Sequence, residues 1–256
     1  MKKPPPVALL CAGNLTDSAI TRFRGLRGRL GPIKSSSLRL ASRFANILRA
    51  GRPVDDYAAF EECSVVLLAL PDAQVEAAIG ELSNAGLDWS RLTVALCSAD
   101  LDCAQLNPLA ALGAESASIC EAPGFEGRLF ILEGDRPAIA QVRSLVESRN
   151  SRIVPVPRGQ KMFYLAAAAC SGPLFTGLLC CAGECLKLAG IASADAAGIL
   201  HTQADRTVRS FIKGSRKRIP PVAGLDRQLA ALRLAHPALA DFLEQTAKLA
   251  SRVSTK

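Results

Sequence analysis

The sequence predicts an α/β fold up to about Pro157 and an all-α part after it. In the first part, short apolar runs alternate with segments of helical periodicity, and the runs at 64–70 and 92–97 are apolar at nearly every position. Such runs are typical of strands buried on both faces of a mostly parallel sheet that helices cover. The strand pattern ends after Pro157. We therefore expect two domains, residues 1–157 and residues 158–256.

The separate elements follow from the same periodicity and from the positions of Gly and Pro. Strands are expected at residues 7–12, 30–35, 64–70, 92–97, 115–120, 128–133 and 152–156. Helices are expected at residues 16–28, 37–49, 72–84, 103–112, 136–149, 160–188, 193–212, 224–235 and 237–253. Gly190, the segment 214–221 and Pro237 separate the last four helices.

A turn with an altered glycine pattern follows the first strand. In a Rossmann-type dinucleotide site this turn reads G-x-G-x-x-G, because its glycines allow a tight turn, close approach of the pyrophosphate and close packing of the helix. Here Cys11 stands at the first glycine position, Gly13 at the second and Thr16 at the third. The position indicates a dinucleotide site, while the two missing glycines leave open whether the turn still binds one.

The residues around the end of the second strand favour NADP over NAD. An NAD site has an acidic residue about 20 positions after the glycines, which binds the ribose. No acid lies between Gly31 and Arg39, and this stretch instead offers cations and hydroxyls, namely Lys34, Ser35, Ser36, Ser37 and Arg39. These groups donate hydrogen bonds and positive charge, as a 2′-phosphate requires. The alternative is that the serines cap the next helix and the two cations are solvated.

Composition excludes several classes of protein. Hydrophobic residues make up 49% of the chain, which excludes a disordered protein. The net charge of +8 comes from arginines that are spread without interleaved aromatics, so we do not expect nucleic-acid binding. The nine cysteines show no paired C-x-x-C spacing and only two histidines accompany them, so we expect no metal and reduced, cytoplasmic cysteines.

An uncharged stretch from Met162 to Gly183 is long enough to cross a bilayer. It is rich in small residues, is interrupted at Gly172–Pro173 and is followed by Glu184 and Lys187. We expect a buried, kinked helix that forms part of a homodimer interface, and no membrane insertion.

In an open α/β sheet, ligands bind at the carboxyl ends of the strands. The loops expected there are 12–16, 34–37, 70–72, 98–100 and 120–123. We therefore look for binding residues in these loops.

The order of several motifs along the chain carries a resemblance to a known family. These are the Gly13 turn, Leu70-Pro71-Asp72, Leu96-Cys97-Ser98-Ala99, Phe130-Ile131-Leu132-Glu133-Gly134-Asp135 and Lys161-x-x-Tyr164-x-Ala166-Ala167-Ala168. Over residues 6–253 the chain resembles the Rossmann-like oxidoreductase family of unknown function. That family belongs to a group of two-domain NADP proteins that includes 6-phosphogluconate dehydrogenase, ketopantoate reductase and pyrroline-5-carboxylate reductase.

The resemblance implies a Rossmann-type NADP-binding domain and an α-helical domain that dimerises, with a small-molecule substrate held between them. By position, the pyrophosphate would contact the turn of Ala12, Gly13, Asn14 and Leu15, and the 2′-phosphate would contact Lys34 and the three serines. The nicotinamide would be bordered by Leu70, Pro71 and Ser98. The candidate proton donors would be Lys161 and Tyr164.

The chain also departs from the family pattern. Cys120-Glu121 stands where the family has His-Pro, Leu165 stands where it has a histidine, and the segment 220–226 lacks the family's arginine. Two groups able to move a proton near neutral pH and one able to hold an anion are therefore missing. Two functions remain open: an NADP-dependent oxidoreductase acting on a small carbonyl or imine compound, or a non-catalytic homodimer that binds a nucleotide or metabolite.

Overall fold

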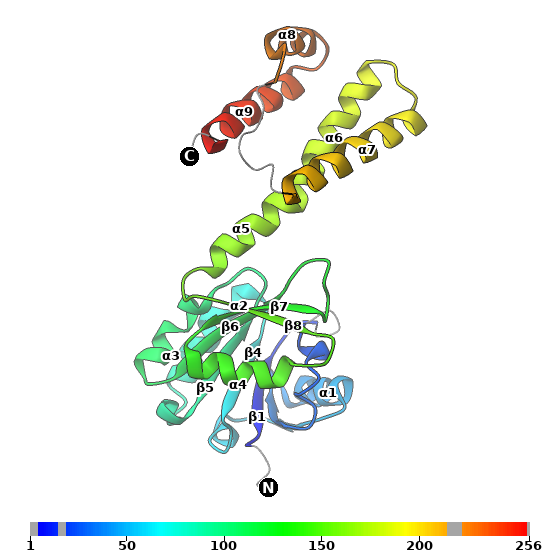
Figure 1. Ribbon diagram of the computed structural model, residues 1–256. Helices are drawn as coiled ribbons and strands as arrows, with labels where there is room; N and C mark the ends of the chain where they lie inside the picture. The colour runs from blue at the N-terminus through cyan, green and yellow to red at the C-terminus, as the bar shows by residue number, and fades with distance from the viewer. Residues whose placement is uncertain (1–4, 15–18, 214–221, 255–256) are drawn as a thin grey trace. The chain divides into compact units, whose positions relative to one another are not determined.

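The computed structural model describes residues 5–14, 19–213 and 222–254 of the chain (Figure 1). Contacts within the chain divide it into two compact units, one ending at Ala168 and the other beginning at Ala169. Helix α5 (Lys161–Ser171) continues from the first unit into the second. The domain boundary expected after residue 157 therefore stays a prediction.

The first unit contains one eight-stranded sheet whose order is β3-β2-β1-β4-β5-β6-β7-β8. All neighbouring strands are parallel except β6 and β7. The strands are β1 (Val7–Cys11), β2 (Leu30–Lys34), β3 (Arg52–Val54), β4 (Val65–Ala69), β5 (Thr93–Cys97), β6 (Glu115–Glu121), β7 (Leu129–Gly134) and β8 (Arg152–Val156). The expected mostly parallel sheet and its seven expected strands are confirmed, and β3 is an additional edge strand.

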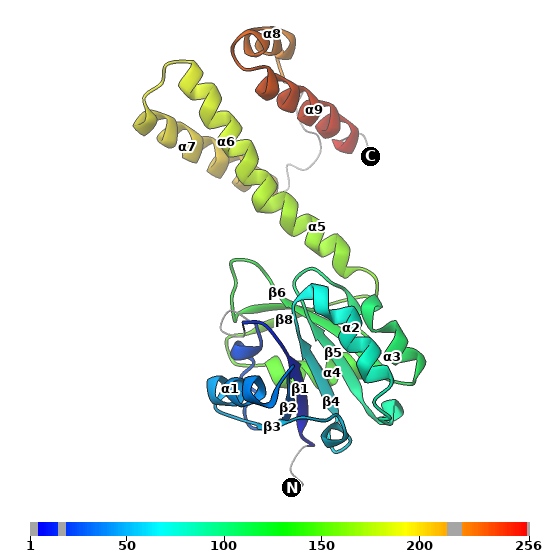
Figure 2. The same cartoon turned by 180° about the vertical axis from the view of Figure 1, so that it is seen from behind.

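Helices cover both faces of this sheet, as Figures 1 and 2 show from opposite sides. The residues of β1 alternate between two cores: Val7 and Leu9 face one core, and Ala8 and Leu10 face the other. Helices α1 (Leu38–Leu48) and α4 (Arg136–Val146) contribute to the first core, and α2 (Asp72–Ser83) and α3 (Asn107–Ala111) contribute to the second. Short 3₁₀ turns complete the unit at η2 (Ala58–Phe60), η3 (Trp89–Arg91) and η4 (Cys103–Leu106).

The helix expected at 16–28 is wrong. Residues 15–18 lie outside the described part, and residues 19–29 contain one 3₁₀ turn, η1 (Ala19–Arg22), followed by turns. Phe23 is buried with its ring edge-on to Phe130, 5.7 Å between centroids. The amide of Gly25 donates to the carbonyl of Leu145 at 2.9 Å. The segment therefore lies directly against the last turn of α4.

The second unit is all-α in its described part, as expected. It contains the end of α5, then α6 (Pro173–Leu188), α7 (Ser193–Ile212), α8 (Leu225–Ala235) and α9 (Pro237–Ser254). The expected helix at 160–188 is interrupted at Gly172, and α6 packs on α7 while α8 packs on α9. The stretch 161–188 is long and apolar enough to cross a membrane by length and composition, with a mean hydropathy of 1.7 in its window. None of the residues in that window is buried within the described part of the chain, so the expectation of a buried helix is wrong for a single copy of the chain.

Candidate functional site

The parallel strands bring the expected loops to one edge of the sheet. Cys11 at the end of β1 pairs with Ala69 at the end of β4, and Cys97 at the end of β5 pairs with Ile119 in β6. The carboxyl ends of these strands therefore lie side by side, where open α/β sheets bind ligands.

The turn after β1 packs directly on the turn after β4. The amide of Ala12 donates to the carbonyl of Ala69 at 3.2 Å. Gly13 has a φ of +73°, and a Cβ at this position would lie 3.1 Å from Cγ of Pro71. Glycine is therefore required here for its conformation and for its space. Asn14 is exposed beside it, whereas Leu15 and Thr16 lie outside the described residues.

Cys11, at the first glycine position of the fingerprint, does not project into this turn. Its side chain is fully buried in the core that contains Val7 and Leu9. Its Sγ lies 3.7 Å from the carbonyl of Lys34, and burial raises the pKa of the thiol. Because the side chain lies inside the sheet core, it leaves the edge of the turn open.

The groups after β2 separate into two kinds. Some are engaged in the fold: the Lys34 ammonium donates to the carbonyl of Asp55 at 2.9 Å and lies 4.7 Å from the ring centroid of Tyr57. Ser37 caps α1, since its Oγ accepts from the amide of Leu40 at 3.3 Å. The helix-capping role that we weighed for the serines is thus confirmed for Ser37.

Other groups of this stretch make no side-chain hydrogen bond among the described residues. The hydroxyl of Ser35 is buried and has no hydrogen-bond partner in the described structure. Ser36 and Arg39 are exposed next to the first turn of α1. The first amides of a helix also lack partners within the helix and favour an anion. A phosphate group fits the exposed donors, whereas the buried hydroxyl of Ser35 would have to turn outward to join them.

The turns after β4 and β5 are tied together by Ser98. Its hydroxyl donates to Asp72 Oδ1 at 2.8 Å and accepts from the amides of Asp100 and Leu101, at 3.1 and 2.9 Å. Leu70 and Pro71 lie in the other turn, with Pro71 preceding α2. The hydroxyl of Ser98 is thus fully used to fix the loop, which supports a positioning role and not direct chemistry.

Lys161 is fully buried at the start of α5. Its ammonium donates to the carbonyls of Ser98 and Leu101, at 2.8 and 2.6 Å, and to the hydroxyl of Ser118 at 2.6 Å. Burial lowers the pKa of this amine, since the charged form loses its hydration. The ammonium therefore joins the loop after β5 to the middle of β6.

Glu133 of β7 holds the backbone around Lys161, and sequence reasoning gave it no role. Its carboxylate is buried and accepts from the amide of Cys103 at 2.9 Å and from the amide of Lys161 at 3.2 Å. Burial opposes its charge, but these hydrogen bonds outweigh that cost and lower its pKa. An acid at an inward position of a buried strand is the sequence signal that could have identified it.

A cavity of about 340 Å³ opens at the ends of β5 and β6. Its lining includes Cys97, Ser98 and Cys120. Burial raises the pKa of Cys97 to about 12 and also raises that of Cys120, so both are neutral thiols near neutral pH. The half-exposed Tyr164 has a pKa raised by burial and by Cys120, so its hydroxyl keeps its proton.

Glu121 lines this cavity and forms an ion pair with Arg22, which the sequence did not predict. Arg22 Nε donates to Glu121 Oε1 at 2.6 Å, and a second contact joins the other guanidinium and carboxylate atoms. Glu121 also accepts from the amide of Gly127 at 2.9 Å.

Among the described residues, no cluster of His, Cys, Asp and Glu has the arrangement of a metal site.

Comparisons with known proteins agree with this architecture. Residues 128–220 match a domain of unknown function (DUF2520). No curated protein matches the chain. A Bacteroides fragilis protein described as a proposed NADP oxidoreductase is similar in structure, with 14% identity, a TM-score of 0.70 and 98% of each chain covered.

Two enzymes of known type are also similar in structure. An imine reductase variant from Myxococcus stipitatus in complex with NAD⁺ has 13% identity and a TM-score of 0.67, over 100% of this chain and 94% of that one. An imine reductase from Aspergillus terreus in complex with NADPH4 and a dibenzazepine has 14% identity and a TM-score of 0.66, over 99% of this chain and 92% of that one. The fold of this chain is therefore that of the Rossmann-like oxidoreductases, which its motif order resembles.

Proposed function

We propose that this protein is an NADP-dependent oxidoreductase that acts on a small carbonyl or imine substrate. The observation that carries the proposal is the sheet edge itself, where Gly13 packs on Pro71 and the exposed Ser36 and Arg39 follow the neighbouring strand β2. Structural neighbours that are imine reductases in complex with nicotinamide dinucleotides support the reaction class.

The residues present fit a nicotinamide dinucleotide at two places. Ala12, Gly13 and Asn14 would offer the backbone of a tight turn to the pyrophosphate. Ser35, Ser36 and Arg39, together with the first amides of α1, would hold the 2′-phosphate. Lys34 would add positive charge from its place beside Tyr57.

A nicotinamide dinucleotide supplies a hydride when bound. The protein orients the substrate, excludes water and supplies a proton. Tyr164 is the better placed proton donor of the two candidates, because its side chain is half-exposed whereas Lys161 is fully buried. Lys161 is better placed as a positioning residue, since all three ammonium hydrogens are used on Ser98, Leu101 and Ser118.

A non-catalytic binding protein is the second candidate. Both histidines of the chain, His201 and His236, belong to the second unit, so the first unit itself supplies no imidazole. Ser98 and Lys161 are fully used in structural hydrogen bonds. Under either function we propose a cytoplasmic homodimer that does not insert into a membrane.

Cofactor choice tests the proposal. NADPH should raise the melting temperature more than NADH, because a ligand that binds only the folded state stabilises it. Arg39→Ala should weaken NADPH binding by about 1–3 kcal/mol, the range for a charge-assisted hydrogen bond, and leave NADH nearly unchanged.

The control is Arg43→Ala, which removes an equally exposed charge one turn further along α1. Equal losses for Arg39→Ala and Arg43→Ala, or for NADPH and NADH, would refute the assignment of the 2′-phosphate site. Binding of NADPH without turnover of any carbonyl or imine compound would favour the non-catalytic function.

A further inference from the structure

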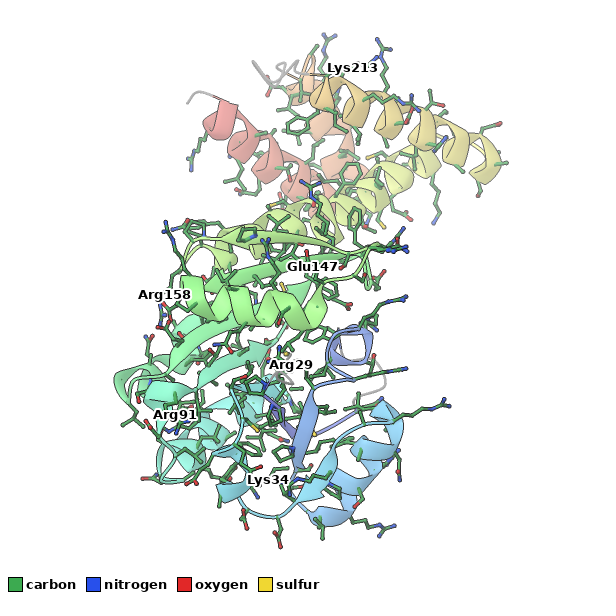
Figure 3. The ribbon with its side chains drawn as sticks, turned by 60° about the horizontal axis from the view of Figure 1, so that its bottom comes forward. Arg29, Lys34, Arg91, Glu147, Arg158 and Lys213 are labelled. Atoms are coloured by element: carbon green, nitrogen blue, oxygen red, sulfur yellow. The ribbon has the colours of Figure 1, made fainter. Side chains whose placement is uncertain are left out.

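A polar cavity of about 730 Å³ lies in the first unit. It shares Glu126 with the cavity at the ends of β5 and β6, and no residue assigned to the dinucleotide lines it. Three segments that are distant in the sequence form it: the turns after β1, the β6–β7 loop and the loop between α4 and β8. Figure 3 labels Glu147, at the end of α4, where the last of these loops begins. The residues that matter for its chemistry are Arg22, Arg24, Arg27, Glu126, Arg128 and Asn150.

Positive charge exceeds negative charge in this arginine pocket. Arg22 pairs with Glu121, but Arg24, Arg27 and Arg128 are exposed and make no ion pair with any described residue. Hydrogen bonds from its own backbone and that of Gly124 lower the pKa of Glu126, and so does the charge of nearby Arg22 and Arg128. Guanidinium groups gathered in one hollow repel each other unless an anion joins them.

Hydrogen bonds to α4 and β8 hold the backbone that carries these arginines. The amide of Gly25, between Arg24 and Arg27, donates a hydrogen bond to the carbonyl of Leu145 in α4 at 2.9 Å. The carbonyl of Arg128 accepts from the amide of Arg152 at 2.6 Å. A fixed backbone lowers the conformational entropy that is lost on binding. The cluster is therefore better preorganised for a ligand than scattered surface arginines would be.

The chemistry of the lining selects the ligand. Arginine presents a planar fork of donors that matches a phosphate group with two hydrogen bonds. The volume falls within the range of small-molecule sites, about 300–1,000 Å³. Ser148 and Asn150 add short polar groups to the rim.

We propose that the arginine pocket binds a small polyanion that carries at least two phosphate groups. The donors assigned to the dinucleotide, from Gly13, Ser35 and Arg39, do not line this pocket. The inference therefore stands independently of the proposed oxidoreductase function.

Calorimetric titration of the full chain with pyrophosphate and with tripolyphosphate tests this inference. The double variant Arg24→Ala/Arg128→Ala should weaken binding at least about tenfold, since each lost charged hydrogen bond is worth about a factor of ten. The matched control is Arg52→Ala/Arg91→Ala, which removes the same charge from β3 and η3 (Arg91 is labelled in Figure 3). A second variant, Arg27→Gln, should weaken binding with its fold intact, because surface substitutions change stability little.

Several results would overturn the inference. The two double variants could lose affinity equally, which would show general charge attraction. Pyrophosphate could be displaced by NADPH and lost in Arg39→Ala, which would place it at the cofactor turn. A single-stranded RNA oligomer could bind more tightly than tripolyphosphate in an arginine-dependent manner, which would make the surface a nucleic-acid site. No detectable binding of either polyphosphate at millimolar concentration would also reject it.

Discussion

At the residue scale, Lys161 shows how hydrogen bonds to neutral groups can stabilise a buried ammonium that contacts no carboxylate. Its ammonium has no exposed surface, and two carbonyls and one hydroxyl accept its hydrogens. Buried charges are tolerated when such dipoles replace their hydration. The position was singled out from the sequence because of its motif. Its complete burial was not foreseen, because a lysine at the start of a helix is usually exposed.

Replacing Lys161 by Met should destabilise the first unit by about 1–3 kcal/mol at neutral pH, because it leaves the Ser98 and Leu101 carbonyls without this donor. The pKa of Lys161 is lowered in the fold, so the unfolded chain binds more protons between the folded pKa and the ordinary lysine pKa. The contribution of this amine to stability therefore rises with pH through that window.

Urea unfolding of the parent and of Lys161→Met at about pH 7 and about pH 10 checks this, since the window lies below the usual lysine pKa. The deficit of the variant should be larger at the higher pH. A deficit that is equal or smaller there would show that the folded pKa of Lys161 is not lowered.

At the scale of elements, local pattern predicted the strands well and failed where packing decides. The seven expected strands are confirmed, and the apolar runs of β1 and β4 are buried at every position. Strand β8 is confirmed although none of its residues is buried. Strand β3 was missed because Arg52-Pro53-Val54 is short and contains a proline. In the segment where a helix was expected, the buried residues are Ile20, Phe23 and Leu26, and their spacing of three residues suits a helix and also successive tight turns.

Substitutions at two glycines, Gly25 and Gly28, test whether this segment packs against α4 as described. A Cβ on Gly25 would lie 2.4 Å from the carbonyl oxygen of Ser144, whereas a Cβ on Gly28 would meet nothing within 4 Å. Gly25→Ala should therefore force the segment away from α4 and cost about 2 kcal/mol or more, as overpacking does. Gly28→Ala should be neutral or slightly stabilising, because it only restricts the unfolded chain. Denaturant midpoints that fall equally in both variants would contradict this packing.

The candidate site is formed by loops from several elements. The sequence predicted which loops form it but not the hydrogen-bond partners of its side chains. The loops after β1, β4 and β5 were expected at one edge because parallel strands place them there. The partners of Lys34 and Ser98 could not be predicted, because Asp55 and Asp72 reach them only through the tertiary fold.

At the scale of the whole molecule, the described part of the second unit buries far fewer apolar side chains than the first unit does. Its buried hydrophobic residues, among those described, are Leu229, Leu239 and Ala240. Large apolar side chains on α6 are exposed, with Leu174 at 61% and Leu178 at 40%. Contiguous exposed apolar surface is typical of an interaction site, and pairing by two-fold symmetry is the simplest way for a single chain to bury it.

We therefore expect a homodimer whose interface includes α6, the helix that carries Leu174 and Leu178. Leu174→Glu and Leu178→Glu should each give aggregation or unfolding and no well-behaved monomer, because the monomer would expose the rest of the same face. Lys187→Glu is the control, since it places a negative charge at an already exposed, charged position of the same helix. Multi-angle light scattering should find a dimer for the parent and for the control. A parent protein that is a stable monomer at micromolar concentration would refute the interface. Recovery of the parent protein only with the membrane fraction would show instead that the apolar helix contacts lipid.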